Sequence, residues 1–505
     1  MLSALGVFAA LAAVTVKEEL LMFYDVGAAG SGPMPSVSFS PWGGGLFSFP
    51  SLTARPCSAD APACILDRTP LSLSSLQSLA LAAHSSSPYT ASVAQYLNDP
   101  IGVRAFSAAG GADSPTWSYW PESTDMNLAW ELAGSPFPIP AGSADTCVMQ
   151  YSSELFKYEN ASCTLYGVST APNATAWAPL WRVAVPGPCS PTFNPHNDAY
   201  GQWRSIAITA DGATLVASLV SNNAQVLLGI SMATGAQLFS VPTPATAYGV
   251  YLSANSKWAL VVSDDGSGGR AAYAYSTATG AQRGATGCTL GWNVPPALSD
   301  DGALIATPDQ NGMWLCAWDE ASGSYGAAVN VAIPARGQTY WFPLELSLLT
   351  VGASTFAAAT YAGDSYSTTG RFYAVDAAAV LSGAPDYIVT DCILDNNAAS
   401  NSALAWSLLR KAGSYWVVGT TGGIQNATSP TEYLFAPGTT DAPSVDAPLW
   451  TFTGAGAVNN LDAALVASAP GRQTLQVLAG GPGNTGDGAD GNGGEVYWHQ
   501  LTVSL

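Results

Sequence analysis

The sequence predicts an all-β chain folded as a single β-propeller, and a repeated turn motif is the first observation behind this prediction. The motif occurs as Thr209-Ala210-Asp211-Gly212, Ser253-Ala254-Asn255-Ser256 and Ser299-Asp300-Asp301-Gly302, with intervals of 44 and 46 positions between the third residues. A second turn motif keeps the same interval, at Ala233–Gln237, Ala278–Gln282 and Ala321–Tyr325. A period of roughly 40–50 residues, with short strands joined by Gly and Asp turns, is typical of propeller blades.

Each repeat is expected to form four antiparallel strands. In the clearest one, Ser205–Thr209 is the innermost strand, followed by Thr214–Val220, Gln225–Ser231 and the outermost strand Gln237–Val241. Apolar and β-branched residues alternate along these segments, which favours strands. The Asp-Gly and Thr-Gly pairs between them supply the positive φ angles that tight turns need.

Extending the pattern gives eight units, with seven as the alternative count, at about 88–134, 144–187, 203–242, 247–290, 294–334, 340–392, 402–453 and 456–505. The last unit lacks its own outermost strand. Leu46–Pro50 resembles the outermost strand Leu238–Pro242, so we expect an N-terminal strand to complete the final sheet and close the ring. The predicted organisation is a signal peptide at 1–16, an N-terminal extension at 17–44 and the propeller at 45–505.

Aromatic residues are expected on the outermost strands, at Trp130, Trp181, Phe239 and Trp450. Large rings at these positions would cover the gap between neighbouring sheets, so this stripe predicts core packing rather than a cofactor site.

The composition points to a secreted protein rather than a partner of nucleic acid. Hydrophobic residues make up 48% and charged residues only 10%, with 35 acids against 15 bases and a net charge of −20. Nucleic acid and anionic membranes require basic patches, which this balance disfavours. The apolar run Leu5–Ala13 resembles a signal-peptide core, and the alternative is a buried first strand or helix. No other run approaches a membrane span.

Eight cysteines and three Asn-x-Ser/Thr sequons, at Asn160, Asn173 and Asn426, favour the secretory route. We expect disulfides between Cys57 and Cys64, between Cys147 and Cys163, and between Cys288 and Cys316. This leaves Cys189 and Cys392 either unpaired or bonded to another chain, unless the pairing is different.

Asp and Asn residues gather in the loops that enter the innermost strands and in those that join the second and third strands. The carboxylates of Asp264, Asp265, Asp309 and Asp395, with His196 nearby, form a candidate Ca²⁺ site, because this ion prefers several oxygen ligands. The alternative is that Asp and Asn are ordinary turn residues. No cofactor is predicted beyond this ion.

The strand patterns Gly370-Arg371-Phe372-Tyr373-Ala374-Val375-Asp376 and Arg270–Tyr275, the latter followed by Thr279-Gly280, resemble the repeat of the quinoprotein-like propellers. The resemblance covers most units and implies the propeller fold. Family enzymes that hold pyrroloquinoline quinone use an adjacent cysteine pair, a calcium site and a catalytic aspartate. This sequence has no Cys-Cys pair, so the resemblance does not imply the dehydrogenase activity.

The expected function is therefore binding without catalysis: a secreted, N-glycosylated module, or the subunit of an extracellular surface or filament assembly. Sparse charge would let large surfaces pack together, and the N-terminal tail could pair with an adjacent subunit by strand addition. The expected partners are other protein subunits or glycans. The alternatives are a glycosidase, lyase or quinone-type oxidoreductase, and a lectin that uses the aromatic segment Trp117–Trp120.

Overall fold

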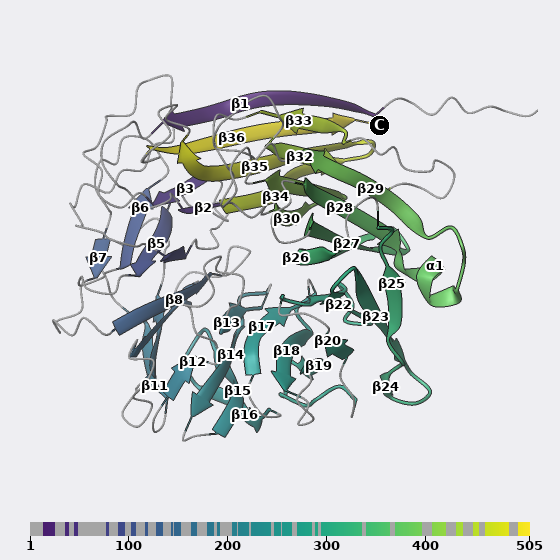
Figure 1. The fold of residues 1–505 in the computed structure, drawn as a ribbon. Helices are drawn as coiled ribbons and strands as arrows, with labels where there is room; N and C mark the ends of the chain where they lie inside the picture. Colours follow the sequence, from purple (N-terminus) through teal and green to yellow (C-terminus); the bar gives the residue numbers. More distant parts are fainter. Residues whose placement is uncertain are drawn as a thin grey trace, which may run out of the picture.

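The computed structural model describes a set of segments distributed along the whole chain. These are residues 14–25, 36–39, 45–48, 77–79, 89–95, 103–107, 117–119, 128–134, 143–144, 146–152, 163–168, 179–185, 189–191, 205–209, 211–221, 224–243, 247–253, 255–264, 270–284, 288–290, 294–335, 340–363, 369–395, 407–420, 431–437, 448–453, 460–483 and 493–504. Nearly all of them are β-strand, in antiparallel sheets that follow one another around a common centre in a propeller-like arrangement (Figure 1).

Eight sheets of four or five strands are present among these described residues. The first contains β4 (Gln77–Leu79), β5 (Tyr89–Gln95), β6 (Val103–Ser107) and β7 (Trp117–Tyr119). The second contains β8 (Leu128–Gly134), β9 (Thr146–Ser152), β10 (Cys163–Val168) and β11 (Trp181–Ala184). The third contains β12 (Cys189–Pro191), β13 (Ile206–Ile208), β14 (Thr214–Ser221), β15 (Ala224–Ser231) and β16 (Gln237–Pro242).

The next four sheets continue in chain order. The fourth contains β17 (Ala247–Leu252), β18 (Trp258–Asp264), β19 (Arg270–Ser276) and β20 (Cys288–Leu290). The fifth contains β21 (Ala297–Leu298), β22 (Leu304–Asp309), β23 (Gly312–Asp319), β24 (Ser324–Tyr325) and β25 (Val329–Ala332). The sixth contains β26 (Trp341–Val351), β27 (Ser354–Gly363), β28 (Thr369–Asp376) and β29 (Ile388–Asp395). The seventh contains β30 (Ser407–Ala412), β31 (Tyr415–Thr420), β32 (Glu432–Phe435) and β33 (Trp450–Phe452).

The eighth sheet, which we call the terminal sheet, joins the two ends of the chain. It contains β34 (Asn460–Ala469), β35 (Arg472–Gly483), β36 (Gly493–Ser504) and, beside β36, the N-terminal strand β1 (Thr15–Asp25). An N-terminal strand does complete this sheet, but it is not the predicted one. Phe23 lies opposite Tyr497, whereas the segment around Phe47 forms β3 (Gly45–Ser48), which pairs with β2 (Ser36–Phe39).

This pairing corrects the predicted domain boundary at residue 45. Part of the expected extension at 17–44 belongs to the terminal sheet, and β1 already begins at Thr15, inside the expected signal peptide. The resemblance between Leu46–Pro50 and Leu238–Pro242 misled the prediction because both are short alternating strands. In this hairpin β2 lies against β34 and β35, and β3 lies against β5.

The predicted strands of the clearest repeat agree with β13 to β16 to within about two residues at each end. One difference is that two short strands, β12 and β13, share the innermost position beside β14. A second difference concerns Trp130, which we expected on an outermost strand. It lies in β8, which starts the second sheet, because β4 supplies the first strand of the sheet before it.

The repeated turn motif has the same hydrogen bonds in all three copies. Thr209 Oγ1 donates to Asp211 Oδ1, which accepts the Ala213 N–H, and the Thr214 N–H returns to Thr209 Oγ1. Ser253 and Asn255 form the second copy, and Ser299 and Asp301 the third. The fourth residue has positive φ in each: Gly212 (67°), Ser256 (53°) and Gly302 (72°). The sequence motif therefore repeats because the same hydrogen-bonded turn recurs in three consecutive sheets.

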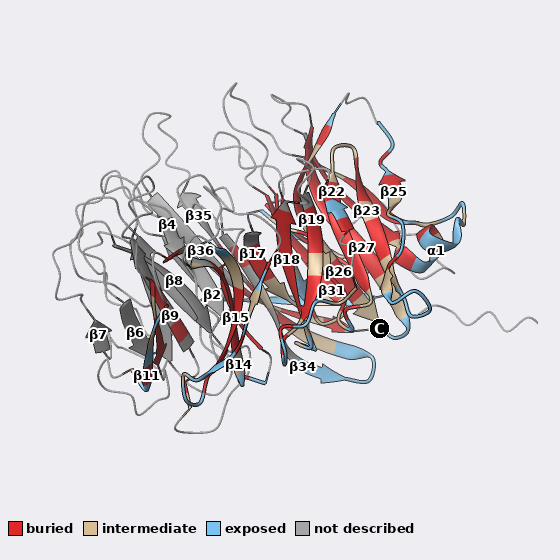
Figure 2. Ribbon diagram, turned by 90° about the horizontal axis from the view of Figure 1, so that it is seen from below, coloured by how far each residue is buried: buried red, intermediate tan, exposed pale blue. Residues whose placement is uncertain are grey.

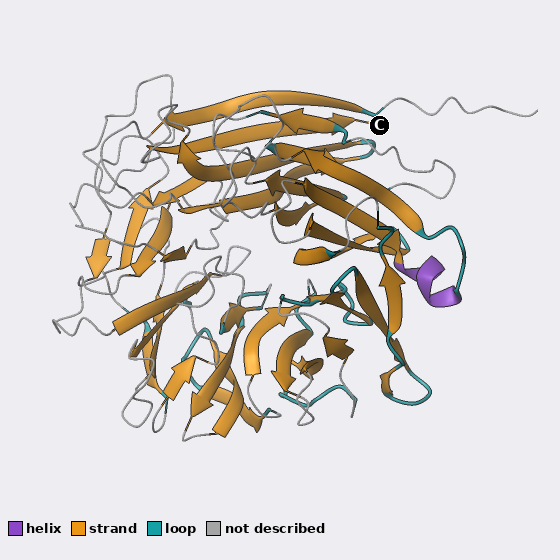
Figure 3. Ribbon diagram, in the orientation of Figure 1, coloured by secondary structure: helices purple, strands orange, loops and turns teal. Residues whose placement is uncertain are grey.

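The hydrophobic core lies between neighbouring sheets. Each described cluster of buried apolar residues draws on two consecutive sheets. Figure 2 shows the buried residues running along the strands and exposed ones in turns, on α1 and on part of β34. The described residues include one helix, α1 (Ala377–Ser382), between β28 and β29 (Figure 3). Among the described residues, no helix is long and apolar enough to cross a membrane.

Aromatic residues on the outermost strands cover the gaps between sheets, as predicted for Trp181 and Phe239. Trp181 Nε1 donates to the Met232 carbonyl of the next sheet at 2.7 Å. A side chain at Gly235 would meet the Trp181 ring, and one at Gly280 would meet the Phe239 ring. Both glycines also have positive φ (71° and 70°). In these two copies of the second repeated motif, glycine is needed for the turn and for the packing of an aromatic ring from the preceding sheet, whereas a Cβ at Gly323 in the third copy would meet nothing within 4 Å.

Gly280→Ala is expected to lower the free energy of unfolding by about 2–4 kcal/mol, because a Cβ would lie 2.5 Å from Phe239 Cδ2 as well as straining the backbone. Gly471 is the matched control, since it has a similar φ of 71° and nothing within 4 Å of the added Cβ. Gly471→Ala should cost only about 1–2 kcal/mol. Urea unfolding of both variants measures the difference, and equal costs would contradict the packing role of Gly280.

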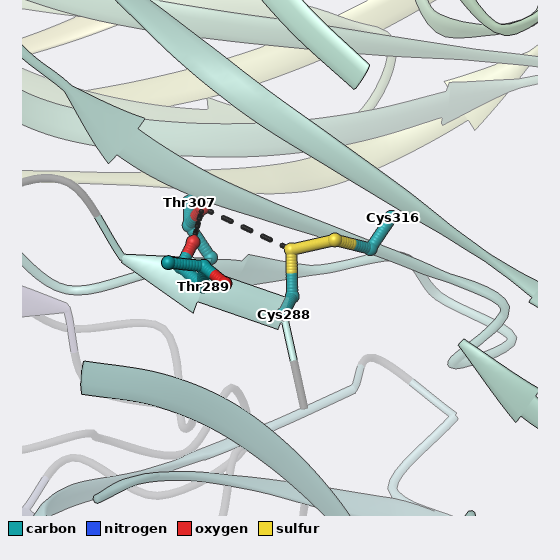
Figure 4. Close-up of a disulfide and its surroundings, with 4 residues drawn as sticks. All are labelled: Cys288, Thr289, Thr307 and Cys316. Carbon is teal, nitrogen blue, oxygen red and sulfur yellow. Dashed lines mark hydrogen bonds between the residues drawn. A yellow bond between two sulfur atoms is a disulfide. The ribbon is translucent and has the colours of Figure 1, made fainter. Parts of the chain in front are cut away.

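Two disulfides join neighbouring sheets. Cys288 and Cys316 form the bond that the sequence predicts, which links β20 to β23, and Thr307 Oγ1 donates to the Thr289 carbonyl beside it at 2.6 Å (Figure 4). The second bond corrects the prediction, because Cys163 pairs with Cys189 and not with Cys147. In the β9–β10 register Cys163 lies opposite Tyr151, and Cys147 lies opposite Gly167, which separates the two sulfurs along the strands.

The remaining cysteine predictions have different outcomes. Cys189 was expected to be unpaired or intermolecular unless the pairing is different, and the structure shows the different pairing, with Cys163. Cys392 is buried in β29, and its Sγ contacts the Ile393 carbonyl. Cys57 and Cys64 lie outside the described residues.

Replacing Cys288 and Cys316 together with alanine is expected to lower the free energy of unfolding by about 3 kcal/mol, because the bond closes a loop of sequence separation 28. The urea midpoint of the double variant, compared with wild type under non-reducing conditions, measures this loss. Wild type treated with reductant should lose at least as much stability as the variant, because reductant also opens the Cys163–Cys189 bond. An unchanged midpoint would show that this bond does not hold the two sheets together.

Candidate functional site

The predicted calcium ligands do not form one cluster in the described part of the chain. Asp264, Asp309 and Asp395 are the last residues of β18, β22 and β29, which belong to three different sheets, and Asp265 lies outside the described residues. Asp309 accepts hydrogen bonds from the Gln310 N–H and from the Asn330 side chain. No group of three or more His, Cys, Asp or Glu side chains that could hold a metal occurs among the residues described. The Ca²⁺ site stays a prediction.

Other predicted positions also lie outside the described residues. They are His196 and the glycosylation sites Asn160, Asn173 and Asn426. The segment Trp117–Trp120 is described only as far as Tyr119, where it forms β7.

The most unusual polar cluster surrounds His499 in β36. Its ring is 0% exposed, with Nδ1 3.0 Å from Glu18 Oε1 of β1 and Nε2 3.5 Å from Glu432 Oε1 of β32. Trp450 Nε1 of β33 donates to the other Glu18 oxygen at 2.9 Å. The ring of Phe452 lies 4.3 Å from the imidazole, centroid to centroid. We call these five residues the His499 cluster; it joins the seventh sheet to the terminal sheet.

The electrostatics of the His499 cluster favour a charged imidazole. Burial opposes the charge, but Glu432 and Glu18 outweigh it and raise the pKa of His499 to about 9. The hydrogen bond from His499 is the main reason that the pKa of Glu18 falls below its ordinary value, against the effect of burial. Glu432 is fully buried, so the imidazolium is the cation that compensates its carboxylate.

This geometry suits attachment better than catalysis. A general acid or base works best with a pKa near the operating pH and with access to a substrate proton. The pKa of His499 is about 9, its side chain is fully buried, and each ring nitrogen faces a carboxylate. The arrangement therefore holds β1 and the seventh sheet to β36.

We expect the stability of the protein to depend on pH through this cluster. The folded pKa of His499 lies above its ordinary 6.5, so its contribution is complete below about pH 6.5 and is lost as the pH rises through 9. The lowered pKa of Glu18 gives a contribution that is present above its ordinary 4.5 and lost at more acidic pH. Urea midpoints from pH 6 to 10 should fall in wild type more than in His499→Gln; parallel profiles would contradict this assignment.

A second buried ion pair lies within the sixth sheet. Arg371 of β28 binds Asp391 of β29 through two bonds of 2.7 and 2.8 Å, and its side chain is 0% exposed. The guanidinium carbon lies 5.0 Å from the ring centre of Trp341 and 5.3 Å from that of Tyr373. Its Nη1 donates to the Pro334 carbonyl, which follows the fifth sheet. Arg371 thus connects two sheets from inside the core.

A third pair joins the first strands of three consecutive sheets. Glu345 of β26 accepts from Arg410 of β30 at 2.7 Å and from the Leu409 N–H, and Arg410 Nε donates to the Leu461 carbonyl of β34 at 2.9 Å. Next to it, Lys411 Nζ lies 2.9 Å from Asp300 Oδ1 in the fifth sheet. These contacts tie the strands that lie nearest the common centre.

The sequence prediction missed all three pairs, although a signal was present. Arg371 and Glu432 each stand in a run of apolar strand residues, in a chain that is only 10% charged. A charge in such a run is expected to be buried and paired. The ion-pair partners could not be predicted from the sequence, because Glu18 and His499, for example, are 481 positions apart.

Comparisons with known proteins found matches among solved structures alone. No protein-family model matches the chain, and no curated protein matches it. Among solved structures, hydrazine synthase from Kuenenia stuttgartiensis has a TM-score of 0.36 at 10% identity, covering 65% of this chain and 88% of that chain. A prolyl endopeptidase has a TM-score of 0.37 at 10% identity, covering 78% of this chain and 53% of that chain.

A chain from the S. cerevisiae complex of Dbp5 with Nup159 and Gle1 has a TM-score of 0.32 at 9% identity, covering 72% of this chain and 88% of that chain. Similarities of this size assign no activity or partner. The class of protein is set by the sheets themselves, which define a propeller-like all-β chain.

Proposed function

We propose that the chain is an eight-bladed β-propeller of the quinoprotein-like type that acts as a secreted, N-glycosylated binding and structural module without catalytic activity. The proposal extends to a role as the subunit of an extracellular surface or filament assembly. Eight described sheets of four or five strands and the three identical turns support the blade count.

One observation carries the functional part of the proposal. The buried charged side chains of the described residues are Arg371, Asp391, Glu345, Glu432 and His499. Each is paired: Arg371 with Asp391, Glu345 with the partly exposed Arg410, and His499 with Glu432 and the partly exposed Glu18. Each group also connects two neighbouring sheets or more. Ionisable groups placed in this way stabilise a scaffold. The two disulfides between sheets indicate an oxidising environment, which suits a protein exposed outside the cell.

Size-exclusion chromatography with light scattering tests the assembly role. We expect a mass above that of one chain that increases with protein concentration. Wild type should be run with and without reductant, because both described disulfides lie within one chain and their reduction should not dissociate subunits. A strictly monomeric protein at all concentrations would contradict the assembly role.

Glycan binding is a second candidate, favoured by one exposed aromatic residue. Tyr340 is 46% exposed and its ring lies 6.5 Å from that of Phe342. The next residue, Trp341, donates its N–H to Asn311 Oδ1 in the turn that carries Asp309. An exposed ring beside amide and carboxylate groups is suited to sugar binding. Tyr340→Ala should abolish glycan-array binding, and Tyr340→Phe should keep it; equal binding by both variants would contradict this site.

A further inference from the structure

The terminal sheet is completed by a strand from the opposite end of the chain. Its strands β34, β35 and β36 are consecutive in sequence, whereas β1 lies more than four hundred residues earlier. In the described sheet β1 is the edge strand, and its ladder to β36 runs from Thr15 opposite Ser504 to Asp25 opposite Glu495. Docking of β1 is therefore an association between two distant parts of the molecule, which need not belong to the same copy.

The contacts of β1 define what the β36 edge recognises. Val16 packs against the apolar cluster that contains Leu461, Leu501 and Val503. Glu18, two residues later on the same face of the strand, accepts from Trp450 and pairs with His499. The edge thus selects an extended segment with an apolar residue followed two positions later by a carboxylate.

The Glu18 carboxylate is the hydrogen-bond acceptor for two side chains, His499 of β36 and Trp450 of β33. Without Glu18, Trp450 Nε1 and His499 Nδ1 would lose the acceptor that the structure gives them. Buried donors that lose an acceptor carry a desolvation cost. The β36 edge is therefore a site that is satisfied only when a strand of the right sequence fills it.

We propose that the edge of β36, with Trp450 and His499 beside it, is a strand-binding site, and that β1 of a second copy of this chain can occupy it. The inference rests on the proposed assembly function. A second copy carries the identical Val16 and Glu18, so the contacts made within one chain and between two chains are the same. The balance between them is then set by protein concentration, and a crowded surface or filament favours exchange between copies.

Mixing two full-length variants that each carry one added cysteine, Thr15→Cys and Ser504→Cys, tests the proposal. The two residues are direct neighbours across the β1–β36 ladder. After incubation and oxidation, a covalent dimer on a non-reducing gel, absent when either variant is oxidised alone, is the expected result. The double variant Thr15→Cys/Ser504→Cys, kept dilute, should form its bond within one chain. If the mixture gives no dimer above the single-variant backgrounds, the proposal is overturned.

Glu18→Gln provides a second readout, with Glu19→Gln as its matched control on the same strand. Loss of the charged acceptor should speed the appearance of the mixed dimer on the order of tenfold or more, since hydrogen bonds to charged groups are the stronger ones. Glu19→Gln should leave the rate within about twofold, as an exposed charge contributes little. Equal rates would overturn the role of Glu18 in recognition. If chromatography shows oligomers but the mixed covalent dimer does not form, this inference is wrong and the proposed assembly function still stands.

Discussion

Arg371→Met should lower the free energy of unfolding by about 3–5 kcal/mol, because it leaves the carboxylate of Asp391 buried without its cation. Asp391 is 5% exposed, and both of its oxygens are bound by Arg371. The substitution also removes the guanidinium contacts with the rings of Trp341 and Tyr373 and the hydrogen bond to the Pro334 carbonyl.

The double variant Arg371→Met/Asp391→Leu separates the ion pair from its packing. Replacing both charges with apolar groups of similar size removes the unpaired carboxylate, and buried pairs replaced in this way often cost little. We therefore expect the double variant to be more stable than the single variant in urea unfolding. A single variant as stable as wild type would show that the pair does not bear on the stability of the sixth sheet.

The second large effect concerns His499. His499→Gln should cost about 3–5 kcal/mol, because Glu432 is fully buried and loses its compensating cation. Glutamine is polar and similar in length, so the cavity it leaves is small and the loss of charge dominates. Urea unfolding followed by tryptophan fluorescence suits this measurement, since Trp450 lies 5.4 Å from the imidazole between ring centres.

The control for His499→Gln is the double variant His499→Gln/Glu432→Gln. Neutralising the buried carboxylate should recover much of the lost stability, since two amides can hydrogen-bond without burying a charge. If the double variant is less stable than His499→Gln, then the ion pair with Glu432 is not what stabilises this junction.

Local sequence signals predicted the blades because their causes are local. The turns at Thr209, Ser253 and Ser299 are built by hydrogen bonds that span five residues, so their spacing is visible in the sequence. Gly235 and Gly280 are also visible as a repeat in the sequence, because each has a positive φ in its turn and leaves room for an aromatic ring. Predictions from these signals agreed with the strands of the third sheet.

Pairing between distant segments was harder to predict, because register is set by tertiary structure. Cys147 and Cys163 lie on neighbouring strands, as expected, but a displacement of four positions keeps them apart. The closing strand was placed at Phe47 from its pattern, whereas the chain uses β1, whose Lys17, Glu18 and Glu19 make it look like a polar segment. Glu18 lies in the terminal sheet because it hydrogen-bonds with His499 and Trp450. No local sequence pattern shows these partners.

Hydrogen exchange with mass spectrometry tests most directly whether β1 completes the terminal sheet. We predict that peptides covering Thr15–Glu19 exchange slowly in the wild-type chain, together with peptides covering Leu501–Val503. Glu18→Gln should speed exchange in both segments at once and leave β26 to β29 unchanged. A β1 peptide that exchanges at the rate of an unstructured segment, while β36 stays protected, would contradict the account.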